Sequence, residues 1–237
     1  MSSSRCALLS ATFWEAGHDH LVELVHQRDT AEKRRLTSLS LTLIGADGRT
    51  LTTVEIDPAQ EMLDLAALAE ATVRRDAGRV MALFDARYDE RVFPYRPHHY
   101  AYLHRRGSAT PPLYYAVNAV LGGVPDRIGA TAMNNFETYV FMSGHPAEGH
   151  AVLLGNAARF SDATAHVTAY YDGQRVQHDV ALAPRAHAEI PLASEQGGHR
   201  LTRVDLKAPF RLASYVVGRR GGSGELVVFD HLFTYNK

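Results

Sequence analysis

The residues best suited to chemistry are histidines, of which the chain has 13. His18 and His20 are two positions apart, a spacing that places both side chains on one face of a β-strand. A second cluster, His98 and His99, lies close to His104. Imidazole is a common ligand of Zn²⁺ and other divalent metals, so the clusters could form a metal site. The candidate metal ligands are His18, His20, His98 and His99. No structural zinc motif with its defined spacing is present, so histidines at the surface or in hydrogen bonds are the other interpretation.

Tyrosine and arginine gather around the second histidine cluster. Both residue types are enriched at interaction surfaces, because they bury a large area at low entropic cost and keep polar groups available. The alternative is that alternate tyrosines pack in the core or at the edge of a sheet. The candidate residues for binding a ligand or partner are Arg91, Tyr95, His98, His99, Tyr100, Tyr102 and His104.

Motifs of catalysis are absent from the sequence. The Gly-x-Ser-x-Gly pattern of a nucleophile elbow does not occur. The glycine-rich run 221–224 lacks the lysine and the following helix of a phosphate-binding loop, and is typical of a hairpin tip. Cys6 lies in an apolar run, where a reactive thiolate is not expected. The sequence therefore favours a protein without catalytic residues.

The elements that would position these residues are mainly β-strands. Leu39, Leu41 and Leu43 alternate with serine and threonine, which predicts a strand with one buried face. Asp47-Gly48 tolerates the backbone angles of a tight turn, and the alternation then resumes, so a β-hairpin is expected. A second hairpin is expected around Asp172-Gly173. Many short strands separated by turns are typical of an all-β sandwich or barrel.

One helix is expected, within residues 59–75. The run is rich in alanine, leucine and glutamate, and Asp57 followed by Pro58 would supply an N-cap and a first helical residue. The corresponding run 185–199 contains proline and two adjacent glycines, which argue against a long helix there.

The second half of the sequence is similar to the first. Residues 37–49 match residues 163–175, and Arg105-Arg106-Gly107 matches Arg219-Arg220-Gly221. The interval is too long for a solenoid repeat and indicates a duplicated domain. Residues 121–133 include Gly122-Gly123-Val124-Pro125, which is typical of a linker. The prediction is two tandem antiparallel β-sandwich domains, residues 1–122 and 132–237, with one short helix in the first.

Composition and charge limit the possible functions. The 237 residues suffice for two domains, and 46% hydrophobic with 22% charged residues is ordinary for a globular protein. A net charge of −1 gives no overall field to attract nucleic acid, so none is expected as a partner. No apolar run approaches the roughly 20 residues of a membrane span. The single cysteine fits a reducing compartment, and a cytoplasmic location is expected.

A pattern in the second half resembles a known family. It begins with Glu137-Thr138 and Val152–Asn156, continues through Asp162–Asp172 and residues 182–190, and ends with Phe210–Val217. In these residues the chain resembles the sensory rhodopsin transducer family of small bacterial β-sandwich proteins. The resemblance implies a non-enzymatic sandwich that oligomerises and binds a protein partner or a small ligand. Members of that family are single domains that form tetramers, so a duplicated chain would reach the same arrangement as a homodimer.

We therefore expect a non-catalytic binding or signalling-adaptor protein, with a protein partner or small ligand. The alternative is a metal-dependent enzyme or metal-binding protein that uses the histidine clusters of the first half. A carbohydrate-binding module is a third possibility, but Trp14 is the single tryptophan available as a stacking platform.

Overall fold

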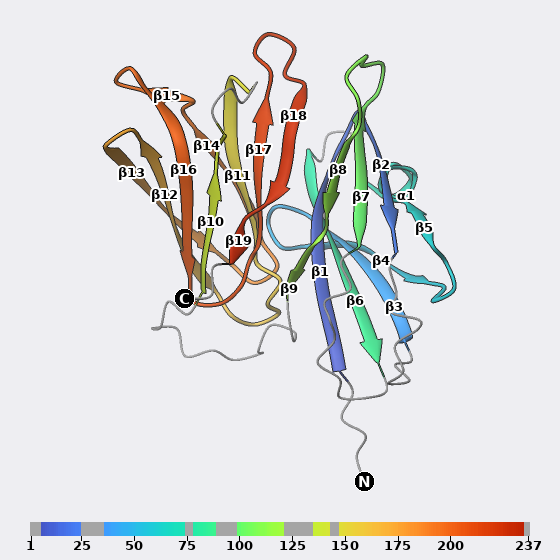
Figure 1. Ribbon diagram of the computed structural model, residues 1–237. Coiled ribbons are helices and arrows are strands. Elements are labelled where there is room, and N and C mark those ends of the chain that lie inside the picture. The colour runs from blue at the N-terminus through green and yellow to red at the C-terminus, as the bar shows by residue number, and fades with distance from the viewer. Residues whose placement is uncertain are drawn as a thin grey trace, which may run out of the picture. The chain divides into compact units, whose positions relative to one another are not determined.

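The computed structural model describes residues 6–24, 36–73, 78–88, 99–120, 135–142 and 147–234. The expected linker, residues 121–133, lies outside the described residues. The chain divides into two compact units, Met1–Val124 and Pro125–Lys237, whose strands are labelled in Figure 1. The strands pair in antiparallel sheets throughout the described ranges, and the prediction of an all-β protein is confirmed.

The first unit has nine described strands in two sheets. The first sheet has the order β4-β3-β6-β1-β9 and the second the order β5-β2-β7-β8. The bounds of these strands are β1 (Cys6–Glu15), β2 (His18–Glu23), β3 (Leu36–Ile44), β4 (Thr50–Ile56), β5 (Met62–Asp64), β6 (Arg79–Tyr88), β7 (Tyr100–Arg105), β8 (Leu113–Ala116) and β9 (Asn118–Val120).

The second unit also has two sheets. Its first sheet has the order β13-β12-β16-β10-β19, with β15 beside β16, and its second the order β14-β11-β17-β18. The bounds are β10 (Asn135–Val140), β11 (Gly149–Gly155), β12 (Ala163–Tyr171), β13 (Gln174–Leu182), β14 (His187–Leu192), β15 (Glu195–Gln196), β16 (His199–Ala208), β17 (Ala213–Arg219), β18 (Leu226–His231) and β19 (Phe233–Thr234).

The two units share one strand order. If β1 to β5 are matched with β10 to β14, and β6 to β9 with β16 to β19, each sheet of the first unit maps onto a sheet of the second without exception among the described strands. The short strand β15 occupies the place in the chain that the helix occupies in the first unit. Such agreement is expected if one unit is a copy of the other.

In the first unit the two sheets face each other as a sandwich. Leu39, Leu41 and Leu43 of β3 are completely buried, as their alternation predicted. Side chains of opposite sheets meet in the interior, where Thr12 Oγ1 of β1 lies 2.6 Å from the Tyr115 hydroxyl oxygen of β8. The core therefore contains hydrogen bonds as well as apolar contacts.

The second unit is built in the same way. Ala165, Val167 and Ala169 of β12 are completely buried, which confirms the second alternating run. Across the sandwich, the Ser214 hydroxyl of β17 donates a hydrogen bond to the Glu137 carboxylate of β10. Here a carboxylate, rather than a pair of hydroxyls, connects the two sheets.

Both predicted hairpins are confirmed. The turn between β3 and β4 has Gly48 at φ +84°, and the backbone N–H of Arg49 donates to Asp47 Oδ1 at 3.0 Å. The turn between β12 and β13 consists of Asp172 and Gly173, both with positive φ (30° and 96°). Two central residues of positive φ match the twist of the flanking strands, which is why Asp-Gly favours such turns.

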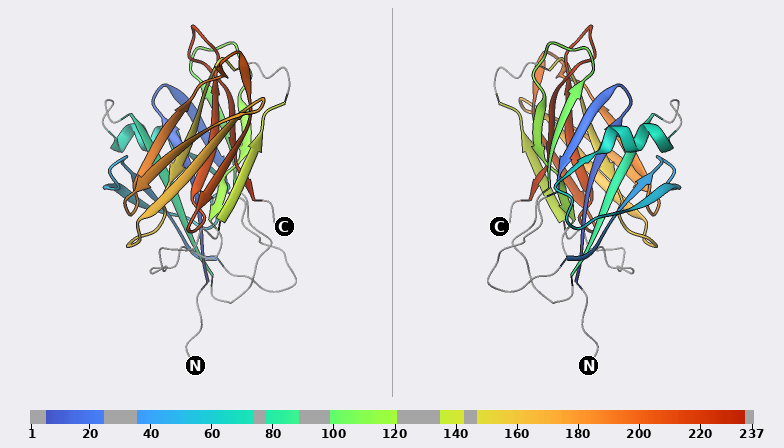
Figure 2. Two further views of the ribbon diagram at one scale, coloured as in Figure 1. Left: turned by 90° about the vertical axis from the view of Figure 1, so that its left-hand side faces the viewer. Right: turned by 90° about the vertical axis from the view of Figure 1, so that its right-hand side faces the viewer.

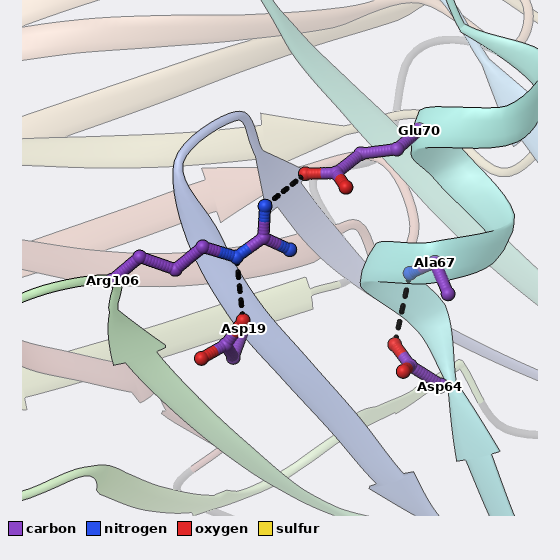
Figure 3. A network of polar contacts seen from close by, with 5 residues as sticks. All are labelled: Asp19, Asp64, Ala67, Glu70 and Arg106. Carbon is purple, nitrogen blue, oxygen red and sulfur yellow. Dashed lines mark hydrogen bonds and ion pairs between the residues drawn. The ribbon is translucent and has the colours of Figure 1, made fainter.

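The helix expected within residues 59–75 is present, but it begins later than Asp57 and Pro58 suggested. Helix α1 (Leu65–Thr72) is capped by Asp64, whose Oδ1 accepts the Ala67 N–H at 2.9 Å (Figure 3), so the prediction of Asp57 as N-cap is wrong. Asp57 instead closes a turn with the N–H of Ala59, and Met62–Asp64 then pairs with β2 as strand β5. Pairing with a strand distant in sequence outweighs the helical propensity of these residues. Figure 2 shows α1 beside β2, which it contacts.

No helix in the described ranges combines the length and the apolar character that a membrane span requires.

Candidate functional site

The second sheet of the first unit has an unusual outer face. On β2, His18, His20 and Val22 are buried, and on β7, Ala101 and Leu103 are buried. Successive residues of a strand point to opposite faces, so the residues between them point outward. We call this outer surface the tyrosine face, and its residues are Leu21, Glu23, Met62, Tyr100, Tyr102 and Tyr114.

On this face, the rings of Tyr100 and Tyr102 both contact the ring of Tyr114. Tyr102 lies opposite Leu21 on β2 and opposite Tyr114 on β8. The ring centroids of Tyr102 and Tyr114 are 4.7 Å apart, and those of Tyr100 and Tyr114 are 5.4 Å apart with planes inclined by 14°. These distances are in the range preferred by aromatic pairs. The rings therefore form a continuous aromatic surface rather than isolated side chains.

The tyrosine face is also where the first unit exposes its large apolar side chains. The exposed fractions are 40% for Leu21, 44% for Met62, 39% for Tyr102 and 54% for Tyr114. No other large hydrophobic residue in the described part of this unit is exposed. Concentration of exposed apolar side chains on one patch is typical of an interaction surface.

An ion-pair network borders the tyrosine face. Arg106 donates from Nε to Asp19 Oδ1 at 2.6 Å and from Nη1 to Glu70 Oε1 at 2.6 Å (Figure 3). These hydrogen bonds, first to Asp19 and then to Glu70, raise the pKa of Arg106. The network connects the turn after β7 to β2 and α1, so it stabilises the border of the face.

The predicted binding residues are distributed between the two faces of the sheet. Tyr100 and Tyr102 belong to the tyrosine face, and His104 also points outward, with Nε2 3.1 Å from the carbonyl oxygen of Thr110. His99 is buried, and its ring lies 5.3 Å from that of Phe84 in the sandwich interior. Arg91, Tyr95 and His98 lie outside the described residues.

Leu21 and Met62 were missed by sequence reasoning. In the run His-Asp-His-Leu-Val-Glu of β2, the histidines are buried and Leu21 is exposed, the reverse of the usual polarity. Met62 belongs to a segment predicted to be helical. The signal available was the alternation within β2, which places Leu21 on the face opposite the histidines. To use it, the polar histidines would have had to be assigned to the core.

Of the four candidate metal ligands, His98 lies outside the described residues, and His18 and His20 lie apart from His99. His18 lies opposite Arg105 and His20 opposite Leu103, which are six and four positions from His99 on the chain. At about 3.3 Å per residue these separations are about 20 and 13 Å along the strand. Side chains stand roughly perpendicular to a sheet, so their rings remain apart. The described residues contain no group of three histidine, cysteine, aspartate or glutamate side chains able to hold a metal ion.

His20 instead takes part in a buried hydrogen-bond network. The Tyr115 hydroxyl oxygen lies 2.7 Å from Nε2 of His20 and 2.6 Å from Thr12 Oγ1. Burial, with a smaller contribution from His18, lowers the pKa of His20 to about 3. The imidazole is therefore neutral at physiological pH. Trp14 is also buried in this core, where it cannot serve as a stacking platform for a sugar.

The second unit contains a buried carboxylate that the sequence analysis did not select. Glu137 is completely buried, accepts a hydrogen bond from Ser214, and has Oε1 3.3 Å from Nε of Arg211. Burial raises the pKa of Glu137, although Arg211 and Ser214 oppose the shift. In the sequence Glu137 stood out only as the start of the pattern behind the family resemblance, and no neighbouring residue predicted its burial.

Asn156, part of the pattern behind the family resemblance, has structural contacts. It is completely buried, and its Nδ2 donates to the carbonyl oxygens of Ser161, Leu182 and Ala183 at 2.8 to 3.2 Å. Its Oδ1 accepts the N–H of Ala158. The side chain therefore satisfies the backbone where the chain leaves β11.

Comparison with known proteins adds no functional assignment. No protein-family model matches the chain, and no curated protein matches it. Among the described surfaces of the first unit, the tyrosine face is the one best suited to bind a partner.

Proposed function

We propose that the chain is a non-catalytic binding or signalling-adaptor protein that binds a protein partner through the tyrosine face. The observation that carries the proposal is the position of Leu21, Met62, Tyr102 and Tyr114, the exposed large side chains of the described first unit, on one face. Water contact with such a surface is unfavourable, and burying a whole apolar side chain is worth about 1.5–3 kcal/mol. Tyrosine is moreover a frequent hot-spot residue of protein interfaces.

The polar clusters support binding rather than catalysis. Thr12, Tyr115 and His20 lie inside the first sandwich, and Glu137 lies inside the second, where a substrate has no access. The outward side chains of the tyrosine face do not pair a nucleophile with a base. Among the described residues, no group of side chains favours the metal-dependent alternative.

The expected test result is selective loss of a partner. The immobilised chain is exposed to an extract of its source cells, and retained proteins are compared between variants. Y102A/Y114A is expected to reduce retention of a specific partner at least tenfold, which corresponds to about 1.4 kcal/mol. The control M142A/F160A removes two side chains of the second unit that are 83% and 73% exposed. Equal retention by wild type and Y102A/Y114A, with both folded by circular dichroism, contradicts the proposal.

We also propose that the two units arose by duplication and that the chain forms a cytoplasmic homodimer. The shared strand order supports duplication. The dimer rests on the resemblance to the sensory rhodopsin transducer family, whose single domains form tetramers. Light scattering of the purified chain is expected to give twice the chain mass of 26.1 kDa. A mass equal to that of one chain, constant with concentration, contradicts the dimer.

A further inference from the structure

The tyrosine face carries a carboxylate whose charge is available to a partner. Three acidic residues lie on the outward side of β2 and β5: Asp19, Glu23 and Asp64. Asp19 is neutralised by Arg106, and Asp64 caps α1 through the Ala67 N–H, as Figure 3 shows. Across the described part of the chain, no hydrogen bond or ion pair occupies the carboxylate of Glu23.

Glu23 lies among the apolar and aromatic members of the face. Its register neighbours are Tyr100 on β7 and Met62 on β5. The pKa of Tyr114 is raised mainly by desolvation, then by Tyr102, and also by the negative charge of Glu23. The carboxylate therefore acts on the same ring that stacks with Tyr100 and Tyr102. The aromatic rings and the Glu23 carboxylate therefore lie close together on the tyrosine face.

Both groups attract a cation. The face of an aromatic ring carries negative potential, and a cation within about 6 Å of its centre is attracted to it. The Glu23 carboxylate adds a full negative charge beside the rings. An anionic ligand would be repelled by both groups, so phosphate and nucleic acid do not fit this surface.

Resting on the proposed function, we propose that the tyrosine face binds an arginine-bearing peptide segment of its protein partner. The guanidinium packs on the exposed rings of Tyr102 and Tyr114 and is neutralised by Glu23, while apolar neighbours of the arginine cover Leu21 and Met62. Arginine fits better than lysine because its planar, weakly hydrated guanidinium stacks on aromatic faces and pairs with carboxylates. The same chemistry already occurs in the second unit, where the guanidinium carbon of Arg203 lies 4.0 Å from the centre of the Tyr170 ring.

The test compares two peptides that differ by one charge. The full chain, labelled at its tyrosines, is titrated with acetyl-Leu-Arg-Leu-amide and with the same peptide containing citrulline, which is neutral and nearly isosteric. We expect saturable shifts of the Tyr100, Tyr102 and Tyr114 ring resonances, with millimolar affinity for the arginine peptide. The citrulline peptide is expected to bind about tenfold more weakly, because it lacks the charge that ring and carboxylate recognise.

Variants separate the charge from the apolar surface. E23Q is expected to weaken the arginine peptide several-fold and leave the citrulline peptide unchanged. E55Q, which makes the same change on the exposed side of β4 in the other sheet, is expected to affect neither. Equal binding of both peptides, lost in Y102A/Y114A, overturns the arginine inference and leaves the tyrosine face as a binding surface. Absence of tyrosine shifts at about 10 mM peptide also overturns the inference, since any specific binding weaker than that is negligible. The proposed function is then tested separately, by whether Y102A/Y114A fails to retain the protein partner.

Discussion

Replacing Glu137 with alanine is expected to destabilise the second unit by about 3 kcal/mol, because removal of one hydrogen-bonded member of a buried polar cluster is among the costliest substitutions. The side chain is completely buried, accepts the Ser214 hydroxyl, and lies 3.3 Å from Nε of Arg211. The substitution removes this acceptor and leaves a cavity between the sheets. Urea unfolding monitored by far-ultraviolet circular dichroism measures the loss.

Glu137→Gln separates the shape of the side chain from its charge. Burial raises the pKa of Glu137 above that of the unfolded chain. The folded state therefore binds more protons than the unfolded state above the ordinary glutamate range, so this group's contribution to stability is largest at low pH and declines as pH rises. Glutamine keeps a similar volume and does not titrate. The stability of E137Q relative to wild type is expected to increase from pH 4 to pH 8.

Two results would contradict the predictions for E137A and E137Q. If E137A lowers the free energy of unfolding by less than about 1 kcal/mol, Glu137 is not an essential connection between the sheets. If E137Q and wild type depend identically on pH, the carboxylate does not carry the predicted proton. Trp14 fluorescence provides an internal reference, because the only tryptophan of the chain lies in the first unit.

The strands with one face toward solvent could be predicted from their alternation, whereas strand β1 was not predicted. Leu39, Leu41 and Leu43 alternate with polar residues because only their side of β3 enters the core. Strand β1 is buried at every position from Ser10 to Trp14, so its sequence contains no alternation. A strand of that kind cannot be distinguished from other apolar segments by period alone.

The candidate site shows a second limit, which concerns long-range partners. The sequence indicated Tyr100 and Tyr102 as binding residues, and left His18 and His20 either as metal ligands or as histidines in hydrogen bonds. His20 can be buried because Tyr115, 95 positions away in the sequence, supplies a hydroxyl partner. No residue near His20 in the sequence indicates that partner. Because His20 and Val22 point into the core, Leu21 between them points outward and is exposed, although leucine is usually buried.

Acidification from pH 7 to pH 5 is expected to cost the first unit about 2 kcal/mol of stability through His20 alone. Burial and the nearby His18 hold the pKa of His20 near 3, whereas its ordinary value is 6.5. The pKa is lower in the folded state, so between pH 6.5 and pH 3 the unfolded chain binds a proton that the folded chain does not. The contribution of His20 is complete above pH 6.5 and is lost as pH falls, at about 1.4 kcal/mol per pH unit.

Two substitutions distinguish titration of His20 from loss of its hydrogen bond. His20→Gln retains a polar partner for Tyr115 but has no proton to bind in this range, so the loss between pH 7 and pH 5 is expected to shrink by about 2 kcal/mol. Tyr115→Phe removes the hydroxyl that lies between Thr12 and His20 and is expected to lower stability by about 1–2 kcal/mol at both pH values. Urea unfolding monitored by the fluorescence of Trp14, which is buried in the same core, reports on the first unit directly. An H20Q variant that loses as much stability on acidification as wild type contradicts the assignment, because another group would then bind the proton.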